Sequence, residues 1–390
     1  MADLLFLTDP AHLLALGLWA SLLIGALWTI GTAPVPRRWM AWAAMLFTVV
    51  VSLPGWTITP DGVIRDTSEY LRFPHDLMGW QLFNGQRMAN GLSWQLLLVW
   101  LGNWYFHTLL VERALGLFWH CLFVGVVCTF PFVSLPALPM VVAVLSATPF
   151  GLWLQRHHLG SDMLLAQALL VAALVAKRRV LAGYWIGLAL SGYVASLPLL
   201  AYPFLWLGRK AWLAYVVVVA LMAWPLYTGW FILFSSYTPA TSLTRLWIGT
   251  TNAFMAFYDG AHSCVASWLW SYPGAQQLSL PLLILLGIGV VLALTTVDGW
   301  RWASVFVAGS VPTIIGGTRC AASHRQMMAL LPLAVLPAWP LVAVSGHIPR
   351  YWTWTLSLLV AGLITYYGLR EWHDPAFWEF WRINGWHSFV

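Results

Sequence analysis

Charge is scarce in this 390-residue chain: 8% of its residues are Asp, Glu, Lys or Arg, whereas a soluble domain carries about 25%. Hydrophobic residues make up 61% of the chain. They recur in runs of roughly 20 residues, the length that a membrane-spanning helix needs. This composition excludes an ordinary soluble protein. It predicts an all-α polytopic membrane protein that forms a single transmembrane domain over residues 1–390.

The chain also lacks the local motifs of several common activities. It contains no Walker-type phosphate loop, CxxC pair, GxSxG turn or HExxH helix, which argues against ATP-driven transport, zinc proteolysis and serine hydrolysis. Only four cysteines are present. Cys121 and Cys128 fall in one predicted helix and indicate core packing. Cys264 and Cys320 fall in predicted outward segments, where they are either free or joined in a disulfide.

Positive charge is concentrated in particular loops. Nine of the 19 basic residues lie in five short loops, accompanied by one acid, Asp298. By the positive-inside rule, these loops face the cytoplasm, and the acidic loop after the second helix faces outward from the plasma membrane. The net charge of +6 therefore reflects topology and not a nucleic-acid partner. The five loops carry Arg37 and Arg38; Lys177, Arg178 and Arg179; Arg209 and Lys210; Arg301; and Arg350.

The hydrophobic runs predict about twelve crossings. Two helices lie within residues 1–55 and are followed by an outward acidic loop, 56–111, whose last part is expected to form interfacial or re-entrant helices. The helical bundle occupies 112–369 and includes a second outward loop, 235–277. The tail, 370–390, is expected to lie on the outer surface as an amphipathic segment. The predicted helices cover about 12–31, 40–56, 112–133, 136–154, 162–177, 181–207 (as two short, broken helices), 211–234, 278–296, 302–318, 327–345 and 351–369.

The first outward loop gathers acidic residues in an otherwise apolar chain: Asp61, Asp66, Glu69 and Asp76. A helix or turn would place Asp66 and Glu69 on one face, because side chains three residues apart are neighbours there. Paired carboxylates at a membrane surface suit a general base or a divalent metal. A solvated loop with ordinary acids has the same spacing, so both interpretations stay open.

Charged residues also flank the outward ends of predicted helices. Arg113 follows Glu112 at a helix start, where it forms either an interfacial ion pair or a contact with an anionic headgroup. Arg156 and two histidines precede a short turn, and Asp162 follows it. Asp162 is either a second acidic site facing the first loop or, like Ser161, a cap of the following helix. Two adjacent histidines rarely bind one ion, so the pair does not by itself predict a metal site.

A cationic cluster formed by Arg319, His324 and Arg325 stands in a predicted outward turn. The positive-inside rule disfavours cations on this side, and charges near a membrane usually have a partner. A lipid phosphate or pyrophosphate is the natural partner, because arginine presents a planar fork of donors. Arg245, in the second outward loop, could join this cluster.

Five segments, taken in order, carry a family resemblance: Asp66-Thr-Ser-Glu-Tyr-Leu71; Thr108-Leu-Leu-Val-Glu-Arg113; Ser146-Ala-Thr-Pro149 through Arg156 to Asp162-Met-Leu-Leu165; Gly187-Leu-Ala-Leu-Ser-Gly192 with Pro198; and His324-Arg-Gln-Met-Met-Ala-Leu-Leu-Pro332. In their order and sidedness they resemble the GT-C class of multi-spanning glycosyltransferases, which includes the protein O-mannosyltransferase and aminoarabinose-transferase-like families.

The resemblance implies transfer of a sugar from a polyprenyl-phosphate donor to an acceptor at the outer face, with inversion at the anomeric carbon. Asp66 would be the general base. Glu69 and Asp162 would orient the acceptor or hold a divalent cation, and no other cofactor is implied. Arg319 and Arg325 would bind the donor phosphate. The substrate-binding residues expected on this basis are Arg113, Arg156, Asp162, Arg245, Arg319, His324 and Arg325.

Two other classes of function stay open. The 28 tryptophans also suit a non-enzymatic scaffold or pigment-associated subunit of a larger membrane-protein complex. Such a subunit would co-purify with other integral proteins or show a cofactor absorption band. A flippase or transporter would place charged groups in mid-helix, and the sequence has few of these.

Overall fold

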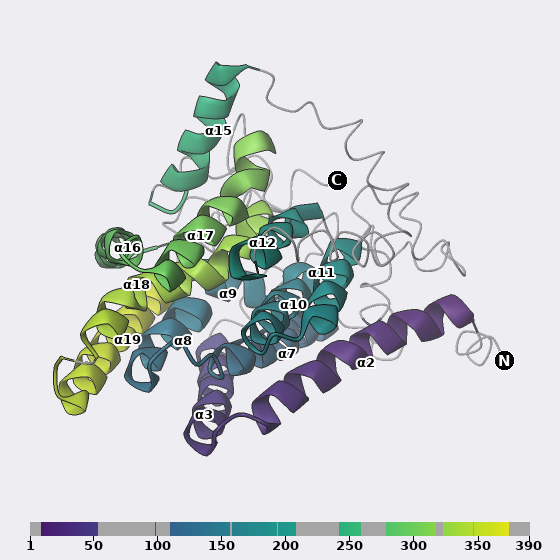
Figure 1. Cartoon of the computed structure of the whole chain (residues 1–390), viewed down its shortest axis with the longest axis horizontal. Coiled ribbons are helices and arrows are strands. Elements are labelled where there is room, and N and C mark those ends of the chain that lie inside the picture. The colour runs from purple at the N-terminus through teal and green to yellow at the C-terminus, as the bar shows by residue number, and fades with distance from the viewer. Residues whose placement is uncertain are drawn as a thin grey trace.

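The computed structural model describes residues 9–53, 98, 110–156, 158–192, 194–207, 242–258, 278–316, 323–345 and 347–373. Every regular element in these ranges is a helix, as the composition predicted, and the helices pack into one bundle (Figure 1). Two helices of the described chain, Pro10–Gly31 and Gln326–Val344, are long and apolar enough to cross a membrane. A third span results if the bent pair Leu135–Ala147 and Pro149–Gln155 counts as one. These helices indicate a membrane protein.

Within the described ranges, the α-helices of the first half are α2 (Pro10–Gly31), α3 (Val35–Ser52), α7 (Leu110–Val127), α8 (Leu138–Ala147), α9 (Pro149–Arg156), α10 (His158–Val175), α11 (Arg179–Gly192) and α12 (Ala201–Leu207). Those of the second half are α15 (Leu243–Met255), α16 (Leu280–Ala293), α17 (Val297–Gly316), α18 (Leu330–Val344) and α19 (Arg350–Trp372). The same part of the chain contains short 3₁₀ helices between them: η2 (Leu135–Ala137), η3 (Val194–Leu200) and η6 (Ser323–Ala329).

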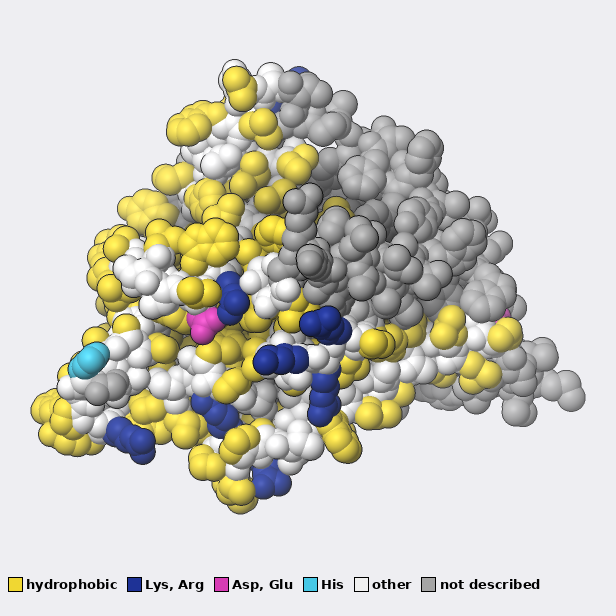
Figure 2. Space-filling model, in the orientation of Figure 1, with side chains coloured by type: hydrophobic (Ala, Val, Ile, Leu, Met, Phe, Trp, Pro, Cys, Tyr) yellow, Lys and Arg dark blue, Asp and Glu magenta, His cyan; other side chains and the backbone are white. Residues whose placement is uncertain are grey.

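The centre of the bundle is formed by helices that are apolar on every side. In α18, all residues from Leu330 to Trp339 are buried, and in α8 only Pro139 is partly exposed. The outer helices are also apolar, but their side chains face outward: Ile24 and Trp28 of α2 and Leu359 of α19 are each more than 60% exposed. Figure 2 shows hydrophobic side chains over much of one face. A hydrocarbon environment would cover such a surface favourably, as expected for a membrane bundle.

The prediction of one helix over 136–154 was wrong. The chain bends by 62° between α8 and α9. A residue before proline is disfavoured in the helical conformation, and Thr148, which precedes Pro149, has the extended ψ of 153°. The Thr148 hydroxyl accepts a hydrogen bond from the Gly151 N–H at 3.1 Å and so caps the start of α9. The bend therefore results from the local Thr148-Pro149 pair within a continuous apolar run.

Other boundaries also differ from the predictions. The stretch 181–207 breaks as predicted, with Pro198 inside the 3₁₀ helix η3 between α11 and α12. Segment 235–277, predicted as a loop, contains α15. Ser242 caps the start of this helix, because its hydroxyl accepts a hydrogen bond from the Arg245 N–H at 3.3 Å. The predicted helix 211–234, the interfacial helices of the acidic loop, the end of the tail and both Cys264 and Cys320 lie outside the described residues.

Arg37 attaches the start of α3 to the end of α7. Its guanidinium donates hydrogen bonds to the carbonyls of Phe130 at 2.6 Å and Val133 at 2.8 Å and lies 3.3 Å from that of Cys128. Carbonyls just beyond a helix end lack helical partners, so a charged donor satisfies them. The two helices are consequently antiparallel, with the end of α3 near the start of α7.

Replacing Arg37 by Gln should lower the thermal unfolding midpoint of the purified protein. A hydrogen bond to a charged group contributes about 1.5–3 kcal/mol, and Gln cannot reach several carbonyls at once. The matched control is Arg38→Gln, because Arg38 makes one long contact, 3.4 Å to the Gly31 carbonyl. Equal losses in both variants would show that the carbonyl contacts of Arg37 do not stabilise the fold.

Candidate functional site

Of the nine predicted site residues, the structure describes the side chains of three: Arg113, Asp162 and Arg245. Three others are placed as backbone positions in α9 and η6: Arg156, His324 and Arg325. The remaining three lie outside the described residues: Asp66, Glu69 and Arg319.

One end of the bundle brings several of these segments together. Helix α10, which carries Asp162, contacts α9, which ends at Arg156, and both contact η6, the segment of His324 and Arg325. Gly160 of α10 faces this segment: a Cβ added there would lie 3.0 Å from the Met327 sulfur of η6. The start of α10, which carries Asp162, and η6, which carries Arg325, are far apart in sequence but lie next to each other.

Asp162 is buried, with 1% of its surface exposed. One carboxylate oxygen accepts the Met163 N–H at 2.8 Å, and the other has no hydrogen-bond partner in the described structure. A buried polar oxygen without a partner is costly. An ionisable residue within an apolar helix is a functional-site hypothesis by default. Asp162 therefore has the best claim to chemistry among the described acids at this end.

The alternative that Asp162 or Ser161 caps its helix was wrong. Helix α10 begins at His158, so both residues lie inside its first turns. The Ser161 hydroxyl donates to the Leu154 carbonyl of α9 at 2.9 Å and so joins the two helices. The Asp162 carboxylate accepts the N–H of the next residue, Met163, and not an N–H at the start of the helix.

A buried polar network adjoins this end. The Gln155 amide donates to the Ser146 carbonyl at 2.6 Å, and its oxygen accepts a hydrogen bond from the Ser52 hydroxyl. Ser146 and Thr48 also share a hydrogen bond at 2.8 Å. This network joins α3, α8 and α9. Since Ser52 is the last residue of α3, the helix that precedes the acidic loop ends beside the α9 residue that precedes Arg156.

The two other described site residues differ in position. Arg113 is half-buried in the first turn of α7, at the end of the bundle where α3 finishes. Arg245 is exposed in the first turn of α15. Helix α15 reaches η6 at its other end, where the Ala253 carbonyl accepts a hydrogen bond from Gln326. Eight helical residues span about 12 Å, so the backbone of Arg245 lies apart from η6.

Sequence reasoning did not single out Gln167, which lies one helical turn and a half beyond Asp162. Its amide donates to the Tyr202 hydroxyl at 2.7 Å and to the Met328 carbonyl at 2.8 Å. A glutamine within an apolar helix was the available signal. These bonds join α10 to α12 and to η6, five residues along α10 from Asp162.

His120 is a buried histidine that forms a hydrogen bond within the bundle. Its Nε2 atom lies 3.0 Å from the Leu145 carbonyl, and the ring is fully buried. Among the described residues, no three His, Cys, Asp or Glu side chains group as a metal site. A divalent cation at the acidic loop therefore stays a prediction.

No protein-family model, curated protein or solved structure matches the chain. The resemblance to GT-C glycosyltransferases consequently rests on the sequence segments alone.

Proposed function

We propose that this chain is a multi-pass glycosyltransferase of the GT-C type in the plasma membrane, with about twelve crossings. It transfers a sugar from a polyprenyl-phosphate donor to an acceptor on the extracytoplasmic side. The observation that supports this best is the buried Asp162, with one oxygen that has no partner in the described structure. It lies where the segment of Arg325 meets the end of α9.

In this mechanism, Asp66 takes the proton from an acceptor hydroxyl or amine. The freed electron pair forms a bond to the anomeric carbon of the sugar, on the face opposite the phosphate. The bond between that carbon and the phosphate oxygen breaks, and polyprenyl phosphate leaves. A single displacement of this kind inverts the anomeric centre.

Basic residues would stabilise the leaving group. Negative charge accumulates on the phosphate oxygen as the sugar bond breaks, so donors placed in advance lower the barrier. Arg319 and Arg325 provide such donors, with His324 between them in sequence and Arg113 and Arg156 at the same end of the bundle. The arginine fork can bind two phosphate oxygens at once.

Asp162 would act on the acceptor side. Its unpartnered oxygen can accept a hydrogen bond from an acceptor hydroxyl, or it can share a divalent cation with Glu69. Either interaction would hold the reacting oxygen in line with the anomeric carbon, which contributes to rate by reducing the entropy cost of alignment.

The proposal can be tested with the full chain in lipid nanodiscs. Polyprenyl-phosphate hexoses and pentoses would be supplied with extracts of envelope proteins and lipids as acceptors. We expect protein-dependent release of polyprenyl phosphate, detected by mass spectrometry, and a product of inverted anomeric configuration. Absence of release with every donor, together with stable co-purification of other integral subunits or a pigment absorption band, would favour the scaffold instead.

A further inference from the structure

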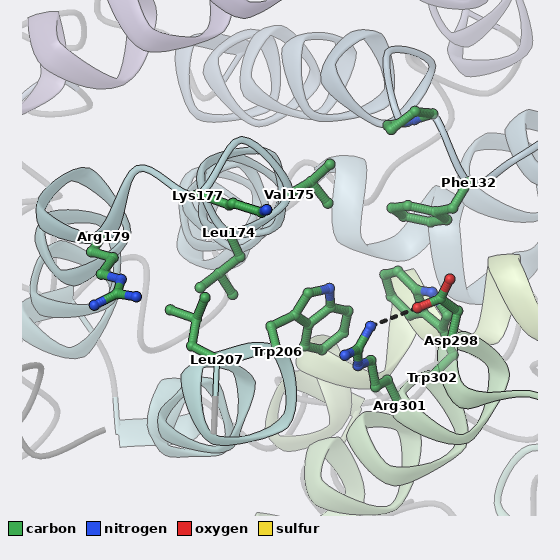
Figure 3. Close-up of a pocket in the computed structure, with 11 residues that line it drawn as sticks. Phe132, Leu174, Val175, Lys177, Arg179, Trp206, Leu207, Asp298, Arg301 and Trp302 are labelled. Atoms are coloured by element: carbon green, nitrogen blue, oxygen red, sulfur yellow. Dashed lines mark hydrogen bonds and ion pairs between the residues drawn. The ribbon is translucent and has the colours of Figure 1, made fainter. Parts of the chain in front are cut away.

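A cavity lies at the end of α10 opposite to Asp162. It has a volume of about 690 Å³ and is lined where α10 and α12 end and α17 begins (Figure 3). Lys177, which follows α10, contributes to it. From Asp162 to Val175, the last residue of α10, the helix rises by thirteen residues, which is about 20 Å. The cavity is therefore distinct from the candidate transferase site.

The cavity combines cations with aromatic surface. Lys177, Arg179 and Arg301 line it, against one carboxylate, Asp298. Figure 3 shows Lys177 and Arg301 on opposite sides of the cavity, with the Trp206 ring between them. Three cations and one anion leave an excess of positive charge over an apolar floor.

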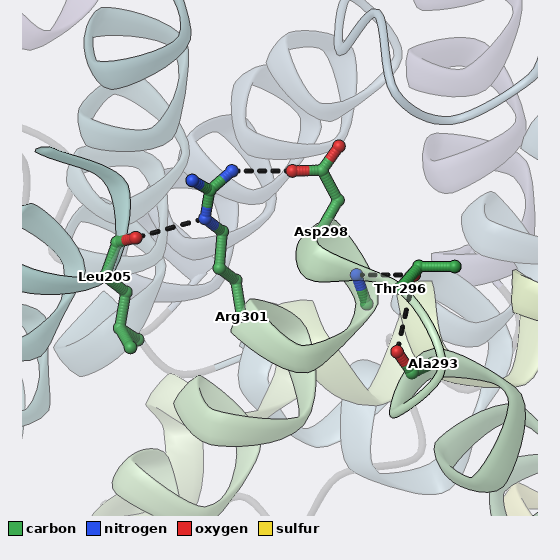
Figure 4. Close-up of polar contacts among 6 residues, drawn as sticks. Leu205, Ala293, Thr296, Asp298 and Arg301 are labelled. Carbon is green, nitrogen blue, oxygen red and sulfur yellow. Dashed lines mark hydrogen bonds and ion pairs between the residues drawn. The ribbon is translucent and has the colours of Figure 1, made fainter.

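Arg301 is held in place by three contacts. Its Nε donates to the Leu205 carbonyl at 3.0 Å, and Nη1 pairs with Asp298 at 2.6 Å (Figure 4). The guanidinium also lies 5.7 Å from the centre of the Trp206 ring. Because Asp298 neutralises the charge of Arg301, this arginine forms part of the cavity wall but adds little net positive charge.

Lys177 supplies charge without a partner in the described structure. It is also the only described residue other than glycine with a positive φ, 56°. This left-handed position ends α10: the next residue, Arg178, donates its N–H to the Ala173 carbonyl at 2.8 Å. Glycine is the usual residue at such a helix end, because a side chain there is strained. Lysine in its place keeps an ammonium group at the rim of the cavity.

We propose that this cavity binds a phosphate group. In the described structure, no carboxylate pairs with Lys177 or with Arg179. Phosphate is a group that Arg and Lys commonly bind together. The aromatic floor suits the apolar part of an amphipathic ligand. The phosphate could belong to an anionic lipid headgroup at this end of the bundle or to a soluble phosphate compound. The site does not depend on the proposed transferase activity.

The test uses a variant that removes the charge without harming the fold. Glycine adopts a positive φ freely, so Lys177→Gly should fold at least as well as the original protein. The control is Arg350→Gln. Arg350 begins α19, which contacts η2 near the same end, and it does not line the cavity. Both substitutions remove one positive charge.

Binding would be followed by calorimetry on the full chain in neutral nanodiscs, with short-chain phosphatidic acid, glycerol 3-phosphate and inorganic phosphate as probes. We expect saturable binding. Lys177→Gly should weaken the affinity about tenfold, because one charge-assisted contact is lost. Arg350→Gln should change the affinity less than about twofold. Preference for phosphatidic acid would identify a lipid site, and equal affinity for glycerol 3-phosphate a soluble ligand. Absence of saturable binding, or equal losses in the two variants, would overturn the proposal.

Discussion

Replacing Asp66 by Asn should lower sugar transfer by about 10²–10⁴-fold, the usual contribution of a general base. Asparagine has nearly the same shape as aspartate, but its amide cannot take the proton of the acceptor. The attacking oxygen or nitrogen would then remain protonated and a poor nucleophile. The measurement is the rate of polyprenyl-phosphate release in nanodiscs, at saturating donor.

The matched control for this experiment is Asp76→Asn, in the same acidic loop. We expect this variant to keep most of the activity, because only Asp66 belongs to the segment that resembles the family motif. Helical circular dichroism and the thermal midpoint should be unchanged in both variants. Wild-type transfer by a folded Asp66→Asn protein would show that Asp66 is not the base. An equal loss in Asp76→Asn would indicate a general effect of loop charge.

The helical class could be predicted from hydrophobicity because each apolar run long enough to cross a membrane must satisfy its backbone internally. That argument located α2 to within two residues of its start. It failed at Thr148, where a Thr-Pro pair bends an apolar run that composition alone cannot divide. It also failed for α15, which is short and carries polar residues, and whose position depends on packing against α17.

The candidate site could be predicted as a set of segments but not as a geometry. Where η6 meets α10, Gly160 faces Met327 and Gln167 donates a hydrogen bond to the Met328 carbonyl. These residues are more than 150 positions apart, and no local pattern encodes their pairing. The capping interpretation of Asp162 failed for the same reason: the start of α10 is determined by packing against α9, including the bond from Ser161 to Leu154.

The close approach of α16 and α18 depends on a glycine. A Cβ added at Gly289 of α16 would overlap the backbone carbonyl oxygen of Leu336 in α18. That carbonyl stands four residues before Pro340, which has no N–H to donate, so it has no regular helical partner. Small residues at helix contacts let backbones approach in this way in membrane proteins.

Gly289→Ala should therefore destabilise the protein by about 1–3 kcal/mol or more, the usual cost of overpacking a well-filled contact. Rigid backbone cannot move aside as a flexible side chain would. Gly287→Ala, two residues away in the same helix, is the matched control, because a Cβ there meets nothing within 4 Å. Alanine favours a helix over glycine by about 1 kcal/mol, so the control should be as stable as the original protein or more so. Thermal unfolding of both variants in the same lipid decides the matter. If the two midpoints agree, α16 and α18 do not approach at Gly289.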